Sequence, residues 1–258
     1  STPHTDMKRK SLIPCLTALL LGFAAAASAN EGALHFHEDF AHTGSDNESL
    51  QSRDWLSARG AGGFVLNPTS DTHSNAVISN LEGGYAFWSE SATLGAMDSQ
   101  GSYPGLLYTE KLNSVAATRL KTVTFTLRNQ STALKIRVAV KVGGDWFVSD
   151  TSFSDSSGAG GPNGPFTVKS LDLEAASWRS LDFVPSPQDA PDPNGVLALG
   201  GASSLPAGDV LAVGLFLDDR ANAGHLRFGE MELFVAEPVG QGTVIMISST
   251  GSFLTRGG

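Results

Sequence analysis

The sequence predicts an all-β fold, a two-sheet antiparallel β-sandwich, and three observations support this. Apolar and polar residues alternate through 122–150, which is the period-two pattern of strands with one buried face. Short apolar segments recur elsewhere between turns rich in Gly, Pro and Asn. No long stretch has the helical period, which argues against an α/β enzyme scaffold.

The first 29 residues are expected to be a leader and signal peptide outside the fold. Met7–Lys10 is basic, residues 12–27 are apolar, and Ala27–Ala29 is a small-residue cleavage signal. Cys15, the single cysteine, lies in this leader, so the exported chain has no disulfide. We therefore expect a secreted protein that is extracellular or attached to the cell surface.

Charge and length limit the classes of partner. Without the leader, the chain has 14 basic and 25 acidic side chains, a formal charge of −11. An acidic chain without basic runs argues against nucleic acid. No second apolar run is long enough to span a membrane. Residues 30–237 are expected to form one sandwich domain, followed by a poorly ordered tail at 238–258.

Residues 122–150 are predicted to form three consecutive antiparallel strands. Turns at Gln130-Ser131 and at Gly143-Gly144, the latter of type I′, set the register. In that register Lys141 lies opposite Trp146, and a row of Thr124, Arg137 and Asp150 forms on the outer face. The predicted core consists of Val123, Phe125, Leu127, Leu134, Ile136, Val138, Val140, Leu215 and Leu217.

The remaining strands are expected, in chain order, at 33–40, 54–58, 63–66, 76–80, 85–89, 106–110, within 167–183, at 209–218 and at 224–236. Residues 209–218 are apolar in both phases, which predicts a strand that is buried on both faces. The apolar phase changes between Phe228 and Met231, so Gly229 is predicted to mark a β-bulge.

The sequence contains no recognisable catalytic motif, such as Gly-x-Ser-x-Gly or His-Glu-x-x-His. His35, His37 and Asp39 share one face of the first predicted strand, in a spacing that resembles part of a metal-ligand set. His73 and His225 do not complete that set. This face is therefore interpreted as solvated surface, and no catalytic residue is predicted.

The candidate ligand-binding residues are aromatic and charged side chains on the outer faces of strands. An outward indole beside a cation and a carboxylate can stack on a sugar ring and bond its hydroxyls. A covering loop over Trp146 is the alternative; with an exposed ring, Trp146→Ala would leave folding nearly intact. The predicted carbohydrate-binding residues are Trp146, Trp88, Tyr85, Arg137 and Asp150.

Three segments together resemble jelly-roll domains of secreted bacterial proteins, similar to carbohydrate-binding modules. They are Glu38–Phe40, the W-x-x-L-x-F strand 178–183, and the paired segments AVGLFLD and LRFGEMEL. The resemblance implies a structural calcium between the first and last strands, with Glu38, Asp39 and Glu230 as matching ligands. The family usually has Asp-Asn where this chain has Gly229-Glu230.

Residues 236–238 followed by Arg256 resemble a degenerate PEP-CTERM sorting tail. The predicted function is a non-catalytic, extracellular glycan-binding or matrix-associated module. A structural or adhesive surface protein and a glycan-cleaving enzyme on the same fold remain alternatives, because one fold hosts all three. A row of exposed rings would favour glycan binding, two carboxylates across a groove would favour cleavage, and neither would favour the structural role.

Overall fold

The computed structural model describes residues 32–46, 48–60, 62–65, 76–79, 84–88, 104–129, 135–154, 165–187, 192–219 and 226–237. These residues form β-strands and two short 3-10 turns, η1 (Leu50–Arg53) and η3 (Ala117–Arg119), without an α-helix. No helix within these ranges has the length and apolar character needed to cross a membrane. The predicted leader, the predicted tail and Leu134 lie outside the described residues.

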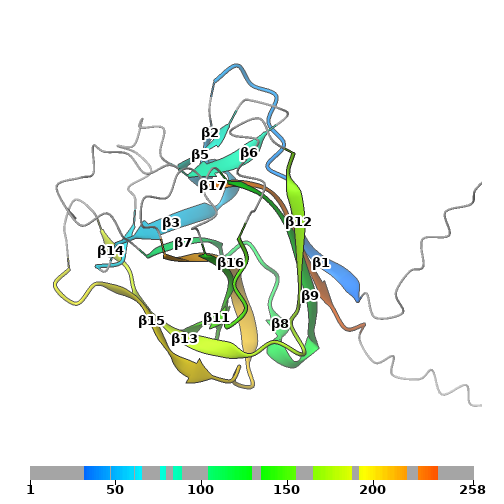
Figure 1. The fold of residues 1–258 in the computed structure, drawn as a ribbon, viewed down its shortest axis with the longest axis vertical. Coiled ribbons are helices and arrows are strands. Elements are labelled where there is room, and N and C mark those ends of the chain that lie inside the picture. The colour runs from blue at the N-terminus through cyan, green and yellow to red at the C-terminus, as the bar shows by residue number, and fades with distance from the viewer. Residues whose placement is uncertain are drawn as a thin grey trace, which may run out of the picture.

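The smaller sheet has seven strands in the order β12-β9-β17-β6-β5-β2, and β1 also pairs with β17 (Figure 1). Its strands are β1 (Ala33–Glu38), β2 (Glu48–Ser49), β5 (Ala76–Ser79), β6 (Tyr85–Trp88), β9 (Leu120–Asn129), β12 (Thr167–Asp172) and β17 (Leu226–Val235). β17 is its central strand, with β9 along one side and with β6 and β1 along successive parts of the other.

The larger sheet has ten strands in the order β14-β4-β3-β7-β16-β10-β11-β13-β15, and β8 also pairs with β16. Its strands are β3 (Trp55–Arg59), β4 (Phe64–Val65), β7 (Gly105–Thr109), β8 (Val115–Ala116), β10 (Lys135–Val142), β11 (Asp145–Ser149), β13 (Trp178–Val184), β14 (Ser186–Pro187), β15 (Val196–Ser203) and β16 (Asp209–Asp219). All described pairs are antiparallel except β14 with β4.

The larger sheet curls until its two ends meet. Figure 1 shows it turning from β3 and β14 through β7, β16 and β11 to β13 and β15. β14 follows β13 directly in the chain yet pairs with β4 at the far end of the sheet. The Ser186 N–H donates to the Gly63 carbonyl at 2.9 Å and so helps to close the curl.

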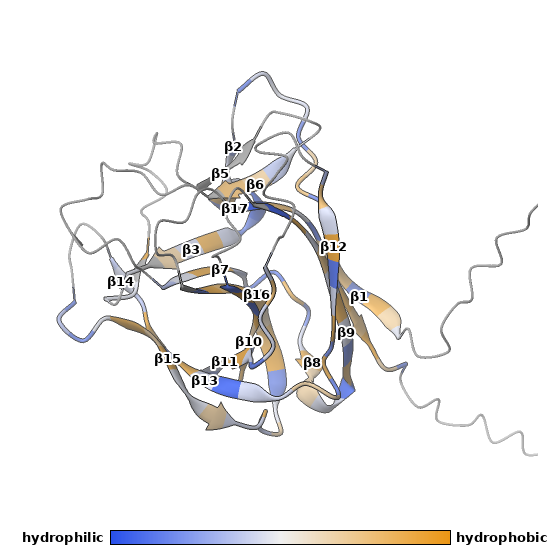
Figure 2. Cartoon of the chain, in the orientation of Figure 1, coloured by the Kyte–Doolittle hydropathy of each residue, from blue (hydrophilic) through white to orange (hydrophobic). Residues whose placement is uncertain are grey.

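The main core lies between the two sheets. The eight described residues of the predicted core are all buried within it, which confirms the predicted face of each strand; they are Val123, Phe125, Leu127, Ile136, Val138, Val140, Leu215 and Leu217. Apolar residues recur along strands of both sheets (Figure 2). At one end of the core, Trp55 packs against Phe40 and Phe228 with ring centroids 5.1 and 5.6 Å away.

A second apolar layer lies on the inner face of the curled sheet, away from the main core. Its buried members are Ala58, Leu106, Tyr108, Ala139, Trp146, Val148, Leu181, Leu197, Ala212 and Phe216. β16 contributes to both layers, since Phe216 lies in this layer whereas Leu215 and Leu217 lie in the main core. The prediction of a strand buried on both faces at 209–218 is therefore confirmed.

The predicted hairpin between β9 and β10 is wrong. β9 pairs with β12 and β17 in the smaller sheet, whereas β10 pairs with β11 and β16 in the larger one. Phe125 and Ile136 nevertheless share the main core, because they face each other across the sandwich. Thr124 therefore does not continue the row of Arg137 and Asp150; it donates to Glu232 instead.

The hairpin between β10 and β11 has the predicted register, with Lys141 opposite Trp146 and Val140 opposite Phe147. Only Gly143 of the two turn glycines has a positive φ, +61°, which is the pattern of a type II′ turn rather than the predicted type I′. The predicted bulge at Gly229 is present as a register shift between Phe228 and Glu230. A similar irregularity in β1 leaves Leu34 exposed, whereas Phe36, two residues further along, is buried.

Candidate functional site: a pocket beside the Gly143-Gly144 turn

Trp146 points into the curled sheet, on the face that its strand phase predicts. It is not an exposed platform: its side chain is 5% exposed. Its ring meets Tyr108 at 5.0 Å and Phe183 at 6.0 Å between centroids, both edge to face. The expectation of an exposed indole is therefore wrong, because the curl of the sheet brings β7 and β13 within reach of β11.

Small residues make this aromatic packing possible. Ala139, Ala212 and Gly214 lie on the strands between Tyr108 and Trp146. A Cβ at Gly214 would lie 2.7 Å from the Tyr108 Cα and 2.1 Å from the Leu107 carbonyl oxygen. The absence of a side chain there lets β7 approach β16 closely. Burial, together with the Glu110 carboxylate, raises the pKa of Tyr108 to about 12.

A pocket of about 570 Å³ opens beside Trp146, where β11 begins and β13 ends. Its lining residues are Gly144, Asp145, Trp146, Phe147, Ser180, Leu181, Asp182, Phe183, Val184 and Val196. The volume is in the range of small-molecule sites, and the lining combines aromatic rings with a few polar groups. The pocket therefore has the chemical character of a ligand site.

The pocket exists because the hairpin turn ends the pairing of β11 early. β11 pairs with β13 only as far as Trp146 opposite Leu181, whereas β13 continues along β15 to Val184. The β11-facing edge of residues 182–184 therefore has no strand partner within the described ranges. Free N–H and C=O groups on such an edge are available to a ligand.

Two carboxylates, those of Asp145 and Asp182, belong to exposed residues that line this pocket. Neither forms a hydrogen bond or ion pair within the part of the chain that the structure describes. Ionised carboxylates only accept hydrogen bonds, which suits a ligand rich in hydroxyl groups. Neither aspartate was singled out from the sequence, because the pocket depends on where the pairing of β11 with β13 stops.

Arg137 and Asp150 share the inner face with Trp146 but lie at the other end of it. Arg137 is four residues from Lys141, the residue opposite Trp146, so the two positions are about 13 Å apart along the strand. The Arg137 guanidinium donates to Asp218 at 2.9 Å, to the Ser149 carbonyl at 2.9 Å and to the Asp150 carbonyl. These hydrogen bonds link β10 to β11 and β16, so Arg137 has a structural role.

Tyr85 and Trp88 belong to β6 in the smaller sheet, so the five predicted carbohydrate-binding residues do not form one site. Tyr85 is buried against Phe166, with centroids 5.8 Å apart, and under the Arg128 guanidinium. Only the strand position of Trp88 lies within the described structure.

Glu38, Asp39 and Glu230 do not fit together as calcium ligands. The Glu38 carboxylate is buried and accepts from the Phe40 N–H at 3.0 Å and from the Trp55 indole at 3.3 Å. Asp39 accepts from the Ala41 N–H in its own turn. Calcium requires six to eight oxygen ligands, and these carboxylates are already used within the fold.

Glu230 instead lies near His37 and Glu232, on the outer face of the smaller sheet. One ligand atom from each of these residues lies within 4.8 Å of the others. His37 Nε2 is 3.0 Å from the Glu230 carboxylate, and Thr124 donates to Glu232 at 3.0 Å. The pairing of β1 with β17 creates this group, which the sequence spacing of His35, His37 and Asp39 did not indicate.

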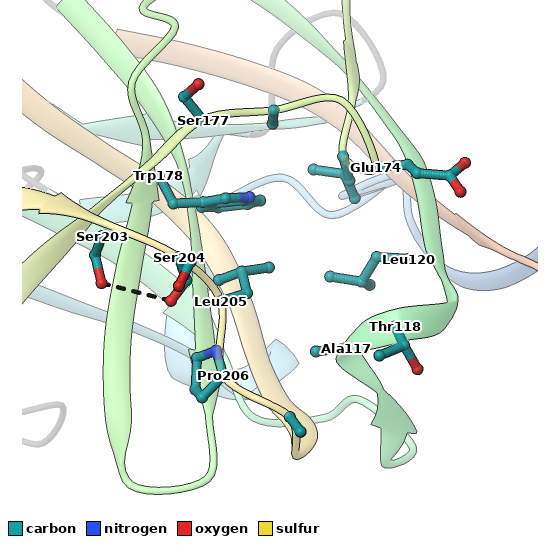
Figure 3. A pocket seen from close by; sticks show the side chains of 13 residues that line it. Ala117, Thr118, Leu120, Glu174, Ser177, Trp178, Ser203, Ser204, Leu205 and Pro206 are labelled. Carbon is teal, nitrogen blue, oxygen red and sulfur yellow. Dashed lines mark hydrogen bonds between the residues drawn. The ribbon is translucent and has the colours of Figure 1, made fainter.

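A second pocket, of about 580 Å³, opens between the two sheets at one end of the sandwich. Figure 3 shows Trp178, Leu205 and Leu120 pointing into this space from different segments. Its carboxylate, Glu174, is paired with Lys121 at 2.5 Å. This pocket therefore lacks the unpaired carboxylates that distinguish the pocket beside Trp146.

No family model and no curated protein matches the chain. Among solved structures, it is similar to a family 11 carbohydrate-binding module from Clostridium thermocellum in complex with a β-1,3-1,4-mixed-linked tetrasaccharide. The identity is 14% and the TM-score 0.43, over 81% of this chain and 98% of that one.

It is also similar to a glycosyl hydrolase family protein from Mycobacterium fortuitum, at 12% identity and TM-score 0.35 over 78% and 100% of the two chains. The catalytic domain of an endo-1,3-β-glucanase from Thermotoga petrophila is similar at 11% identity and TM-score 0.33, over 81% and 100%. The chain is an all-β, two-sheet antiparallel sandwich. The solved structures to which it is similar include proteins whose names describe glycan binding and glycan cleavage.

Proposed function

We propose that the chain is a secreted, non-catalytic module that binds a glycan in the pocket beside Trp146. The observation that carries the proposal is the composition of that pocket. One recess is lined by the partly exposed Phe183 beside the buried Trp146, by the carboxylates of Asp145 and Asp182, and by a strand edge; neither the carboxylates nor the edge has a partner among the described residues. Sugar rings need an apolar face for stacking, which Phe183 offers, and fixed acceptors for their hydroxyls, which the two carboxylates offer.

Affinity electrophoresis tests the proposal directly. The wild-type chain is run through gels with and without neutral and acidic polysaccharides, and a ligand retards it. Asp182→Asn should weaken retention about tenfold or more in apparent affinity, because hydrogen bonds to charged groups contribute about 1.5–3 kcal/mol. Asp182 is exposed and has no partner within the described ranges, so this substitution should leave folding intact.

Glu237→Gln is the matched control. Glu237 is also exposed but does not line the pocket, and its substitution removes the same single charge. Mobility in gels without polysaccharide should therefore change equally in the two variants. Retention that falls equally in both would argue against this pocket, and an unretarded wild type in every gel would favour a structural or adhesive surface protein.

Cleavage of a glycan is the second candidate, because Asp145 and Asp182 line the same pocket. Glycosidases use two carboxylates that flank the scissile bond. Reducing-sugar release by the wild type, abolished in both Asp145→Asn and Asp182→Asn, would establish this activity. Retention on a polysaccharide without release would support the binding module.

A further inference from the structure

The outer face of the smaller sheet contains two arginines side by side. Arg227 on β17 lies directly opposite Arg128 on β9 in the strand register. Their exposed fractions are 5% and 3%. Like charges directly opposite each other destabilise a sheet, and a buried charge is costly unless an opposite charge or complete hydrogen bonding compensates it.

Aromatic rings flank this pair. The Arg227 guanidinium lies 5.3 Å from the ring centroid of Phe87, its cross-strand neighbour on β6. The Arg128 guanidinium lies 5.1 Å from Tyr85 and 4.6 Å from Phe166. Ring faces attract cations, but they do not replace the in-plane hydrogen-bond acceptors that a guanidinium needs.

Arg227 has no acceptor among the residues that the structure describes. Its Nε and Nη1 atoms are buried, and no described group forms a hydrogen bond with either atom. No described carboxylate forms an ion pair with it. The acidic residues further along its own strand, Glu230 and Glu232, are engaged by His37 and Thr124.

Three other arginines of the chain have hydrogen-bond or ion-pair partners for their guanidinium groups. Arg137 is held by Asp218, and Arg119 donates twice to the Ala236 carbonyl. Arg179 donates twice to the Gly200 carbonyl and lies 3.6 Å from Asp150. Arg227 differs from all three, and an unsatisfied buried group in a native fold requires an explanation.

We propose that Arg227 binds an oxyanion: a carboxylate, sulfate or phosphate group. Such a group supplies both the negative charge and several acceptor oxygens, and guanidinium geometry matches it well. The flanking rings of Phe87, Tyr85 and Phe166 are apolar walls that suit an oxyanion attached to a sugar ring. A free inorganic anion offers the same chemistry, so the experiment distinguishes the two sources.

Thermal melting with added anions at constant ionic strength is the test, with sodium chloride as the reference and sodium sulfate and sodium glucuronate as probes. A bound anion at 100 times its dissociation constant should raise the Tm of the wild type by about 5–10 °C above chloride. Isothermal titration of the wild type with each probe gives an independent measure of binding. If the wild type is retained on a uronate polysaccharide and binds sulfate and glucuronate only weakly by Tm shift and titration, the oxyanion belongs to a glycan. If only sulfate shifts the Tm and gives a titration signal, the site binds a free anion.

Arg227→Met should abolish the anion-dependent shift. In chloride alone it should melt at or above the wild-type temperature, because a buried charge without a partner is replaced by an apolar side chain. Arg179→Met is the control, since the arginine that it removes has partners, and its anion response should equal that of the wild type. Absence of binding by titration, or an equal shift in wild type and Arg227→Met, would overturn the proposal.

Discussion

Trp146→Ala is the substitution whose outcome separates the curled sheet from a flat one. In a flat sheet the indole would be exposed and its loss would be nearly neutral. In the structure it is buried, with Tyr108 and Phe183 both edge to face against it. The same residue is thus a surface group in one arrangement and a core group in the other.

The expected loss of stability follows from this burial. Truncation of a buried tryptophan or phenylalanine to alanine costs about 3–5 kcal/mol, including the cavity left behind. Each aromatic pair contributes about 0.5–1.5 kcal/mol beyond buried area, and Trp146 makes two. We therefore expect a loss in the upper half of that range, which is a large part of the 5–15 kcal/mol typical of a domain.

Urea denaturation followed by far-ultraviolet circular dichroism measures this loss. The midpoint should fall while the slope with denaturant stays the same, as for a change in stability alone. Val168→Ala is the control, because Val168 is 70% exposed and should change stability by no more than about 0.5 kcal/mol. A loss below about 1 kcal/mol for Trp146→Ala would refute the burial of the indole and the second apolar layer with it.

Two further predictions concern protons and metal ions. Because the pKa of Tyr108 is raised from 10.0 to about 12, its neutral form stabilises the fold below pH 10, and this stability is lost as the pH rises towards about 12. Tyr108→Phe should flatten that alkaline decline in denaturation experiments, and identical declines would contradict it. Calcium binding remains a prediction: melts with calcium and with a chelator should differ, and Glu230→Gln should remove the difference if the ion lies near His37 and Glu232. If the wild type melts at the same temperature with calcium and with a chelator, calcium does not stabilise this domain.

The class of fold and the inward face of most strands could be predicted from the amino-acid sequence. Alternation along 122–150 assigned Phe125 and Ile136 to the core, and both are buried. The Gly143-Gly144 turn fixed the register of β10 with β11. These features are local, because side-chain direction has a period of two along any strand and a two-residue turn allows one pairing.

Which strands are neighbours depends on the packing of the whole chain and could not be predicted from the sequence. Alternation is the same whether β9 and β10 pair in one sheet or face each other across the sandwich, so the predicted hairpin between them was wrong. The curl of the larger sheet then buried Trp146, and the early end of β11 opened a pocket at Asp182. Arg227 came to lie against Arg128 through the same long-range pairing. Contacts between distant segments depend on how whole sheets pack and twist, and no short sequence pattern carries that information.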